Sequence, residues 1–161
     1  MALIVLVIDP GPTNCGICVY DNREPRVIEA HKALPVDEAL YILDIYAGRS
    51  ALVAIERVQS YGIAGASLLR TAEVGGMLHH CASSLGLGVV WLYRREVLRG
   101  LDVTGKGNRD SLVRQRLIEM HGGDRASAVG TKKVPGPLYG VASHAWQALA
   151  VAVVAGLEAG T

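Results

Sequence analysis

The stretch LIVLVIDPGPTNCGICVYD, residues 3–21, decides the fold. Residues 3–8 are all apolar, a run that is typical of a strand buried on both faces. The Pro-Gly-Pro of residues 10–12 predicts a turn into a second strand over residues 16–20. Asp9 stands between the first strand and the turn, where an uncompensated carboxylate costs several kcal/mol. Amide groups of the turn or a bound cation could each compensate it.

Outward from this hairpin, apolar periodicity and turn signals predict a third strand and then alternating helices and strands. The third strand is expected at residues 26–31 and the later ones at 51–55 and 88–93, with helices at 37–47 (capped by Asp37), 66–85, 96–99, 109–120 and 141–155. Three hairpin strands followed by crossover units describe an α/β fold, a mixed five-stranded sheet with helices on both faces. At 161 residues the chain is expected to be a single domain, residues 1–161.

Composition excludes several classes of protein. No apolar run approaches the roughly 18 residues that cross a bilayer, and the apolar start meets Asp9 too soon for a signal peptide. We therefore expect a cytoplasmic protein with no membrane partner. Cys15 and Cys18 have the spacing of some zinc or redox sites, but in a strand they point to opposite faces, which favours buried structural thiols.

Charge is distributed unevenly along the chain. Residues 1–90 carry 6 basic and 9 acidic side chains, whereas residues 91–133 carry 10 basic and 5 acidic ones. The second part is therefore at +5 and the first at −3. This concentration indicates a polyanionic partner, although a solvated basic helix face would give the same count.

A second carboxylate, Glu56, also ends an apolar strand. If the two strands are parallel neighbours, Asp9 and Glu56 emerge at the same edge of the sheet, where their charges repel. A hard divalent cation such as Mg²⁺ or Mn²⁺ would explain the pair, because such ions collect carboxylate oxygens. The alternative for Glu56 is a surface ion pair with Arg57 or with another neighbouring residue.

The last predicted helix carries one polar stripe in a segment otherwise made of Ala, Val, Leu and Trp. His144 and Gln147 are spaced i and i+3, so they share a face, with Ser143 on its flank. Such a face could complete a site with the two carboxylates. The alternative is a histidine that only packs.

Four blocks of sequence, in order, resemble the motifs of the RuvC-type Holliday junction resolvases, and the last two resemble a bacteriophage branch of that family most closely. They are IDPGPTNCGICVYD, AIERVQSYG, TGKGNRDSLVRQRL and GTKKVPGPLYGVASHAWQALAVAV. The resemblance spans nearly the whole chain. It implies a ribonuclease-H-like fold, a homodimer packed through residues 66–85, and a structure-selective endonuclease. Its substrate would be four-way or branched DNA, cut by paired nicks that leave 5′-phosphate and 3′-hydroxyl ends.

The resemblance also assigns roles. By motif position, Asp9, Glu56 and His144 are the catalytic residues and the ligands of two Mg²⁺ or Mn²⁺ ions per active site. The next family position, commonly Asp in bacterial members, is Gln147 here, which offers an oxygen but no charge, so one ion is expected to bind weakly. Asp110 is a further candidate ligand, but an acid near a helix start is also stabilised by free amides, and we favour that role.

DNA contacts are expected from an aromatic residue and from basic side chains. Tyr61 sits where the family has an aromatic near the junction centre and could stack on an unpaired base; an ordinary half-buried ring is the alternative. Phosphate contacts are expected from Lys106, Arg109, Lys132 and Lys133. Close approach of the partner subunit is expected at small residues of the dimer helix, namely Ala66, Ala72, Gly75 and Gly76.

Two other classes of function are open at this stage. Residues 8–14, IDPGPTN, also resemble the first phosphate loop of sugar kinases with the actin-like fold, but that architecture needs two lobes and 161 residues provide one. The neutral Gln147 raises a second alternative, a catalytically inactive protein that binds DNA junctions without cutting them.

Overall fold

A computed structural model describes residues 4–49, 51–105 and 109–159. The strands are β1 (Ile4–Pro10), β2 (Asn14–Asp21), β3 (Arg26–Pro35), β4 (Ala51–Arg57) and β5 (Gly88–Tyr93). The helices are α1 (Val36–Tyr46), α2 (Ala66–Ser84), α3 (Arg94–Gly100), α4 (Arg109–Met120), α5 (Arg125–Ala128) and α6 (Ala145–Ala159). The five strands form one sheet in the order β3-β2-β1-β4-β5. β1 pairs with β2 antiparallel and with β4 in parallel, so the predicted mixed sheet is confirmed.

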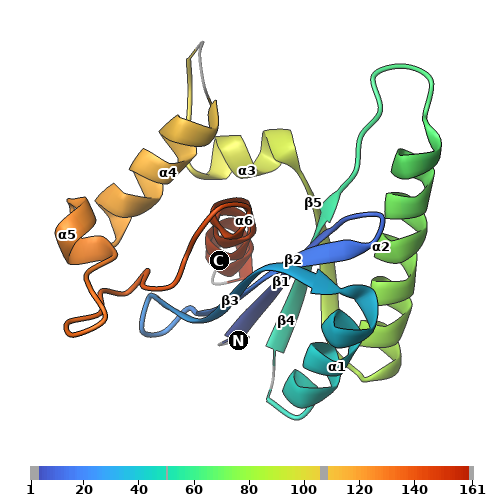
Figure 1. The fold of residues 1–161 in the computed structure, drawn as a ribbon, viewed down its shortest axis with the longest axis horizontal. Coiled ribbons are helices and arrows are strands. Elements are labelled where there is room, and N and C mark those ends of the chain that lie inside the picture. The colour runs from blue at the N-terminus through green and yellow to red at the C-terminus, as the bar shows by residue number, and fades with distance from the viewer. Residues whose placement is uncertain (1–3, 50, 106–108, 160–161) are drawn as a thin grey trace.

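Helices cover both faces of the sheet, as predicted: α1 and α2 on one side, and α3 to α6 on the other (Figure 1). The alternation within β1 explains this, because Val5 and Val7 belong to the core under α6 whereas Leu6 and Ile8 belong to the core under α1 and α2. The side chains of β2 alternate in the same way: Cys15 is buried in the core under α1 and α2, and Cys18 in the core under α6. Both cysteines are free, as their spacing indicated.

Helix α6 is the centre of the fold. It is almost entirely buried and packs on β1 and β2, and its alanines and valines permit that close approach. Gly100 of α3 also lies against it, since a Cβ at Gly100 would fall 2.7 Å from Cγ1 of Val154. At the end of α6, the side chain of Asn22 donates to the carbonyl of Gly156 at 3.1 Å. α6 thereby ties the helical layer to the strands that carry the candidate site.

Three predicted helix starts are wrong, one of them that of α3, which begins at Arg94 rather than at residue 96. The last helix begins at Ala145 rather than at residue 141, because Ser143 has a left-handed backbone with φ of 47°, which interrupts a helix. Helix α1 begins after Pro35, and Asp37 lies in its first turn without capping it. The short helix α5 was not predicted; Asp124 caps it by accepting from the Ser127 amide at 3.0 Å. No helix in the described ranges is long and apolar enough to span a membrane.

A buried histidine makes the stability of the fold depend on pH. The Nδ1–H of His121 donates to the Leu117 carbonyl at 2.8 Å, and Nε2 accepts from the Tyr20 hydroxyl at 2.8 Å. Burial lowers the pKa of His121 below its ordinary 6.5. Just below pH 6.5, His121 therefore binds a proton in the unfolded chain but not in the folded protein. The contribution of neutral His121 to the free energy of unfolding is fully present above pH 6.5 and is lost as the pH falls below it.

We expect the free energy of unfolding to decline more steeply below pH 6.5 in the wild type than in His121→Gln, which cannot titrate. Urea unfolding at pH 8, 7, 6 and 5 would measure this. The matched control is His80→Gln, which changes an exposed histidine of α2. Identical pH profiles for His121→Gln and the wild type would contradict the assignment.

Candidate active site

Asp9 and Glu56 meet at one end of the sheet. β1 and β4 are parallel with Ile8 opposite Ile55, so the next residue of each strand is a carboxylate at the same level. Both carboxylates line one pocket of about 330 Å³, together with Tyr61 from the β4–α2 loop. The prediction that parallel pairing brings the two acids together is therefore confirmed.

The two carboxylates are held in unfavourable surroundings for negative charge. Burial raises the pKa of Asp9, against the opposing effect of His144 and Arg94. Burial and then the charge of Asp9 raise the pKa of Glu56 to about 7, and Asp110 adds to this while Arg94 opposes it. Further positive charge in the pocket would therefore stabilise both carboxylates in their ionised form.

Arg57 does not neutralise Glu56. Its guanidinium lies over the rings of Trp91 and Tyr93, 5.3 Å from each centroid, and donates to the Tyr93 hydroxyl at 3.3 Å. The surface ion pair considered for Glu56 and Arg57 is therefore wrong, because Arg57 is engaged with the aromatic side chains of β5.

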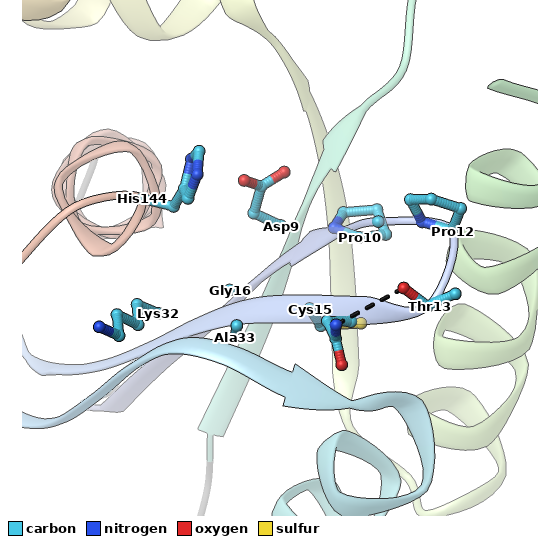
Figure 2. A pocket seen from close by; sticks show the side chains of 11 residues that line it. Asp9, Pro10, Pro12, Thr13, Cys15, Gly16, Lys32, Ala33 and His144 are labelled. Carbon is cyan, nitrogen blue, oxygen red and sulfur yellow. Dashed lines mark hydrogen bonds between the residues drawn. The ribbon is translucent and has the colours of Figure 1, made fainter. Parts of the chain in front are cut away.

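His144 approaches Asp9 from the other side. It is the residue before α6, and its carbonyl accepts from the Ala148 amide at 3.3 Å, so it occupies the N-cap position. Its exposed imidazole and the Asp9 carboxylate border a second pocket of about 370 Å³ (Figure 2). Asp9 thus lies between two pockets, with Glu56 on one side and His144 on the other.

Gln147 and Asp110 each use a side-chain oxygen to bind Arg94. Oε1 of Gln147 accepts a hydrogen bond from Nη1 of Arg94, and Oδ1 of Asp110 accepts from Nη2 of the same guanidinium at 2.5 Å. Asp110 lies in the first turn of α4, as predicted, but its described partner is Arg94. The predicted face shared by His144 and Gln147 is therefore divided: His144 faces Asp9, and Gln147 binds Arg94.

Sequence reasoning missed two basic residues of the site. Arg94 follows β5, which is parallel to β4, so the same strand-end argument that found Asp9 and Glu56 could have found it. Lys32 of β3 lines the pocket between Asp9 and His144 (Figure 2), and no signal in the sequence marks it apart from other lysines.

The predicted DNA-binding residues lie in different places. Tyr61 is 92% exposed at the edge of the carboxylate pocket, which rules out the half-buried ring considered as its alternative. Arg109 opens α4, next to Asp110. Lys132 and Lys133 are exposed on a tight turn that lies outside both pockets around Asp9. Lys106 lies outside the described residues.

The donors at this end of the sheet fit a hard divalent cation. Two carboxylates with raised pKa are ligands that Mg²⁺ and Mn²⁺ both accept, and the imidazole favours Mn²⁺ over Mg²⁺. Within the described ranges, no group of three or more His, Cys, Asp or Glu side chains is placed so that it could hold a metal ion.

The sequence of the chain is similar to those of named bacterial proteins. No family model matches the chain. It is 31% identical over 169 residues to "Crossover junction endodeoxyribonuclease RuvC" of Leifsonia xyli subsp. xyli, covering 95% of this chain and 73% of that protein. The protein of the same name from Nocardia farcinica is 28% identical, over 96% of this chain and 87% of the relative.

Two solved structures share the fold. A Thermus thermophilus RuvC structure matches with a TM-score of 0.68 at 22% identity, covering 98% of this chain and 97% of that one. T. thermophilus RuvC in complex with Holliday junction substrate matches with a TM-score of 0.63 at 22% identity, over 98% and 94% of the two chains. These matches confirm the predicted ribonuclease-H-like sheet with its helices.

Proposed function

The chain belongs to the RuvC family of crossover junction endodeoxyribonucleases, and we propose that it resolves four-way or branched DNA junctions by paired, metal-dependent nicks. The observation that carries the proposal is the meeting of Asp9 and Glu56 at the ends of parallel strands, with His144 beside them. The family assignment removes the reason for considering an actin-like phosphotransferase.

Asp9 and Glu56 would hold the divalent cation, Mg²⁺ or Mn²⁺. When bound, such a cation supplies positive charge to the scissile phosphate and eases deprotonation of the attacking water. The family resemblance implies two ions per site. Asp9, which faces both pockets, is the residue suited to both positions, and the second ion would depend on His144 and on phosphate oxygens.

His144 is suited to a second role, because its ring is exposed and borders the pocket at Asp9. A neutral imidazole there can take the proton of a water that attacks phosphorus in line. The bond from phosphorus to the 3′ oxygen then breaks, and the products are a 5′-phosphate and a 3′-hydroxyl.

Tyr61 is the proposed contact at the centre of the junction. Its ring is almost fully exposed on the β4–α2 loop, beside the pocket that holds the carboxylates. An exposed aromatic ring can stack on an unpaired base, a contact worth about 1 to 3 kcal/mol. Arg109 and Lys106 are further phosphate contacts in this proposal.

Lys132 and Lys133 are proposed to hold the DNA backbone away from the cut. The Thr131 amide donates to the Val134 carbonyl at 2.9 Å, and the Val134 amide donates to Oγ1 of Thr131 at 3.2 Å, so the turn that presents both lysines is well defined. Changing both to Ala should lower the slope of log affinity against log salt by about 1.8 per protomer.

The wild type binds the junction more tightly than the double variant, and the ratio of their affinities should fall by about tenfold between 50 and 200 mM salt. Fluorescence anisotropy on a labelled junction would measure it. Arg49→Ala is the control, since Arg49 precedes β4 and so lies at the opposite end of the sheet from Glu56. An unchanged slope in the double variant would remove both lysines from the DNA interface.

The proposed assembly is a homodimer through α2, which would set two active sites at a fixed separation for two cuts. Leu69, Ala72, Gly76 and Met77 are exposed on that helix, in support of such a contact. Gly75 does not belong to this exposed surface of α2. It is buried, and a Cβ there would lie 3.2 Å from the Trp91 ring. The expectation that Gly75 faces a partner is therefore wrong.

A catalytically inactive junction-binding protein is the second candidate. One observation favours it: the oxygen of Gln147, at the position commonly acidic in bacterial members, is bonded to Arg94. We propose a cytoplasmic protein in either case. The resemblance to a bacteriophage branch stays a prediction, since the relatives reported above are bacterial.

The deciding experiment is cleavage of an end-labelled four-way junction in Mg²⁺, Mn²⁺ or Ca²⁺, with linear duplex of the same sequence as control. We expect symmetrical nicks in the junction with Mg²⁺ or Mn²⁺ and none in the duplex. Tight junction binding without nicking in any metal would favour the inactive binding protein, and cutting of both substrates alike would refute junction selectivity.

A further inference from the structure

Arg94 connects three parts of the site. It is the first residue of α3, directly after β5, and its guanidinium lines the pocket formed by Asp9 and Glu56. Its side chain is only 30% exposed. Of the described basic residues, it is the one whose charge acts on both carboxylates, since it lowers the pKa of each.

Two helices hold the guanidinium in place. Nη1 donates to Gln147 of α6, and Nη2 donates to Asp110 of α4. A guanidinium is a planar fork that stays charged at all ordinary pH values, so two acceptors on different helices fix both its position and its plane. A guanidinium has five N–H donors, so these two bonds to described residues do not exhaust its capacity to donate to a ligand in the pocket.

The identity of residue 147 determines the charge on this side of the site. A carboxylate there would attract a cation, whereas the amide of Gln147 adds no negative charge and offers its oxygen to Arg94. The side of the site next to α6 therefore already contains a fixed positive charge. A phosphate that enters the pocket meets this charge before any second ion is bound.

We propose that Arg94 is a catalytic residue of this chain, which contacts a nonbridging oxygen of the scissile phosphate and supplies positive charge where residue 147 lacks a carboxylate. The proposal rests on the nuclease function proposed above. Water oxygen forms the new bond to phosphorus, the electron pair of the broken bond stays on the 3′ oxygen, and that oxygen takes up a proton. Arg94 keeps its own protons throughout and stabilises the charge on the phosphate oxygens.

The test combines cleavage with two readouts that do not depend on it. Arg94→Gln should lower single-turnover junction cleavage about 10²-fold at saturating Mn²⁺ and weaken junction binding less than about tenfold, since one contact is lost. Arg94→Lys should fall between it and the wild type. Arg99→Gln, an exposed arginine of the same helix, is the matched control and should cleave normally.

Contact with the phosphate is tested by a junction that carries a neutral methylphosphonate at the scissile linkage. Without divalent cations, the wild type should bind it less tightly than the natural junction, and Arg94→Gln should bind both equally. Manganese binding, followed by electron paramagnetic resonance, gives the second readout. Gln147→Asp should gain a further Mn²⁺ per protomer only when combined with Arg94→Gln.

The outcomes separate this inference from the function on which it rests. A wild type that nicks no junction refutes the proposed function. A wild type that cleaves, with Arg94→Gln cleaving equally well, overturns the role of Arg94 alone. Equal losses in Arg94→Lys and Arg94→Gln, with both variants melting at the wild-type temperature, would likewise overturn a role for the charge.

Discussion

Replacing Asp9 with Asn is expected to lower junction cleavage by a factor on the order of 10³, since it removes the group best placed to stabilise the cation that the reaction needs. Asp9 lies between the pocket of Glu56 and the pocket of His144, so one substitution affects both. The fold should not suffer. Asn is isosteric and neutral, and it relieves the repulsion that raises the pKa of Glu56.

Junction affinity should stay within about threefold of wild type in Asp9→Asn, because the phosphate contacts are made by other residues. Single-turnover cleavage and anisotropy on the same labelled junction would measure the two effects. Asp44→Asn, on the exposed side of α1, is the matched control. Equal loss of cutting and binding would indicate misfolding instead, and wild-type cleavage would remove Asp9 from the active site.

Gly76→Glu is expected to convert paired nicks into slow single nicks by breaking the proposed dimer. A Cβ at Gly76 meets nothing within 4 Å in the single chain, so a longer side chain fits the monomer without strain. Glutamate also has a higher helix propensity than glycine, by roughly 0.5 kcal/mol. The monomer should therefore be as stable as before, while a charged side chain is buried wherever two copies of α2 meet.

Sedimentation velocity and a cruciform plasmid assay would measure the two consequences of Gly76→Glu. We expect a monomer that releases nicked circles, where the wild type produces linear plasmid by cutting both strands within one binding event. Gly48→Glu, which adds the same charge at an exposed glycine outside α2, should behave like the wild type. A Gly76→Glu variant that remains dimeric would exclude this face of α2 as the interface.

The parts of the fold that depend on local periodicity could be read from the sequence. The run at residues 3–8 requires a strand buried on both faces, and a strand followed by crossover helices requires parallel neighbours. Asp9 and Glu56 follow from that geometry alone, because the ends of adjacent parallel strands meet. Their pairing is therefore the most secure part of the site.

Other parts of the site depend on tertiary contacts that no short pattern encodes. The left-handed backbone of Ser143 delays α6 and makes His144 a cap residue, and it is this turn that aims the imidazole at Asp9. The side-chain oxygen of Gln147 accepts a hydrogen bond from Arg94, a residue 53 positions away in the sequence. Lys32 lines the pocket beside Asp9 because β3 pairs with β2, the strand next to β1.

The central claim is that Asp9 and Glu56 share a divalent cation. Crystals grown with Mn²⁺ and a four-way junction carrying an uncleavable linkage test it most directly, through the anomalous signal of manganese. We expect a peak within coordination distance of both carboxylates and of the scissile phosphate. A peak bound elsewhere, with the two carboxylates bridged only by protein side chains and the phosphate remote from them, would contradict it.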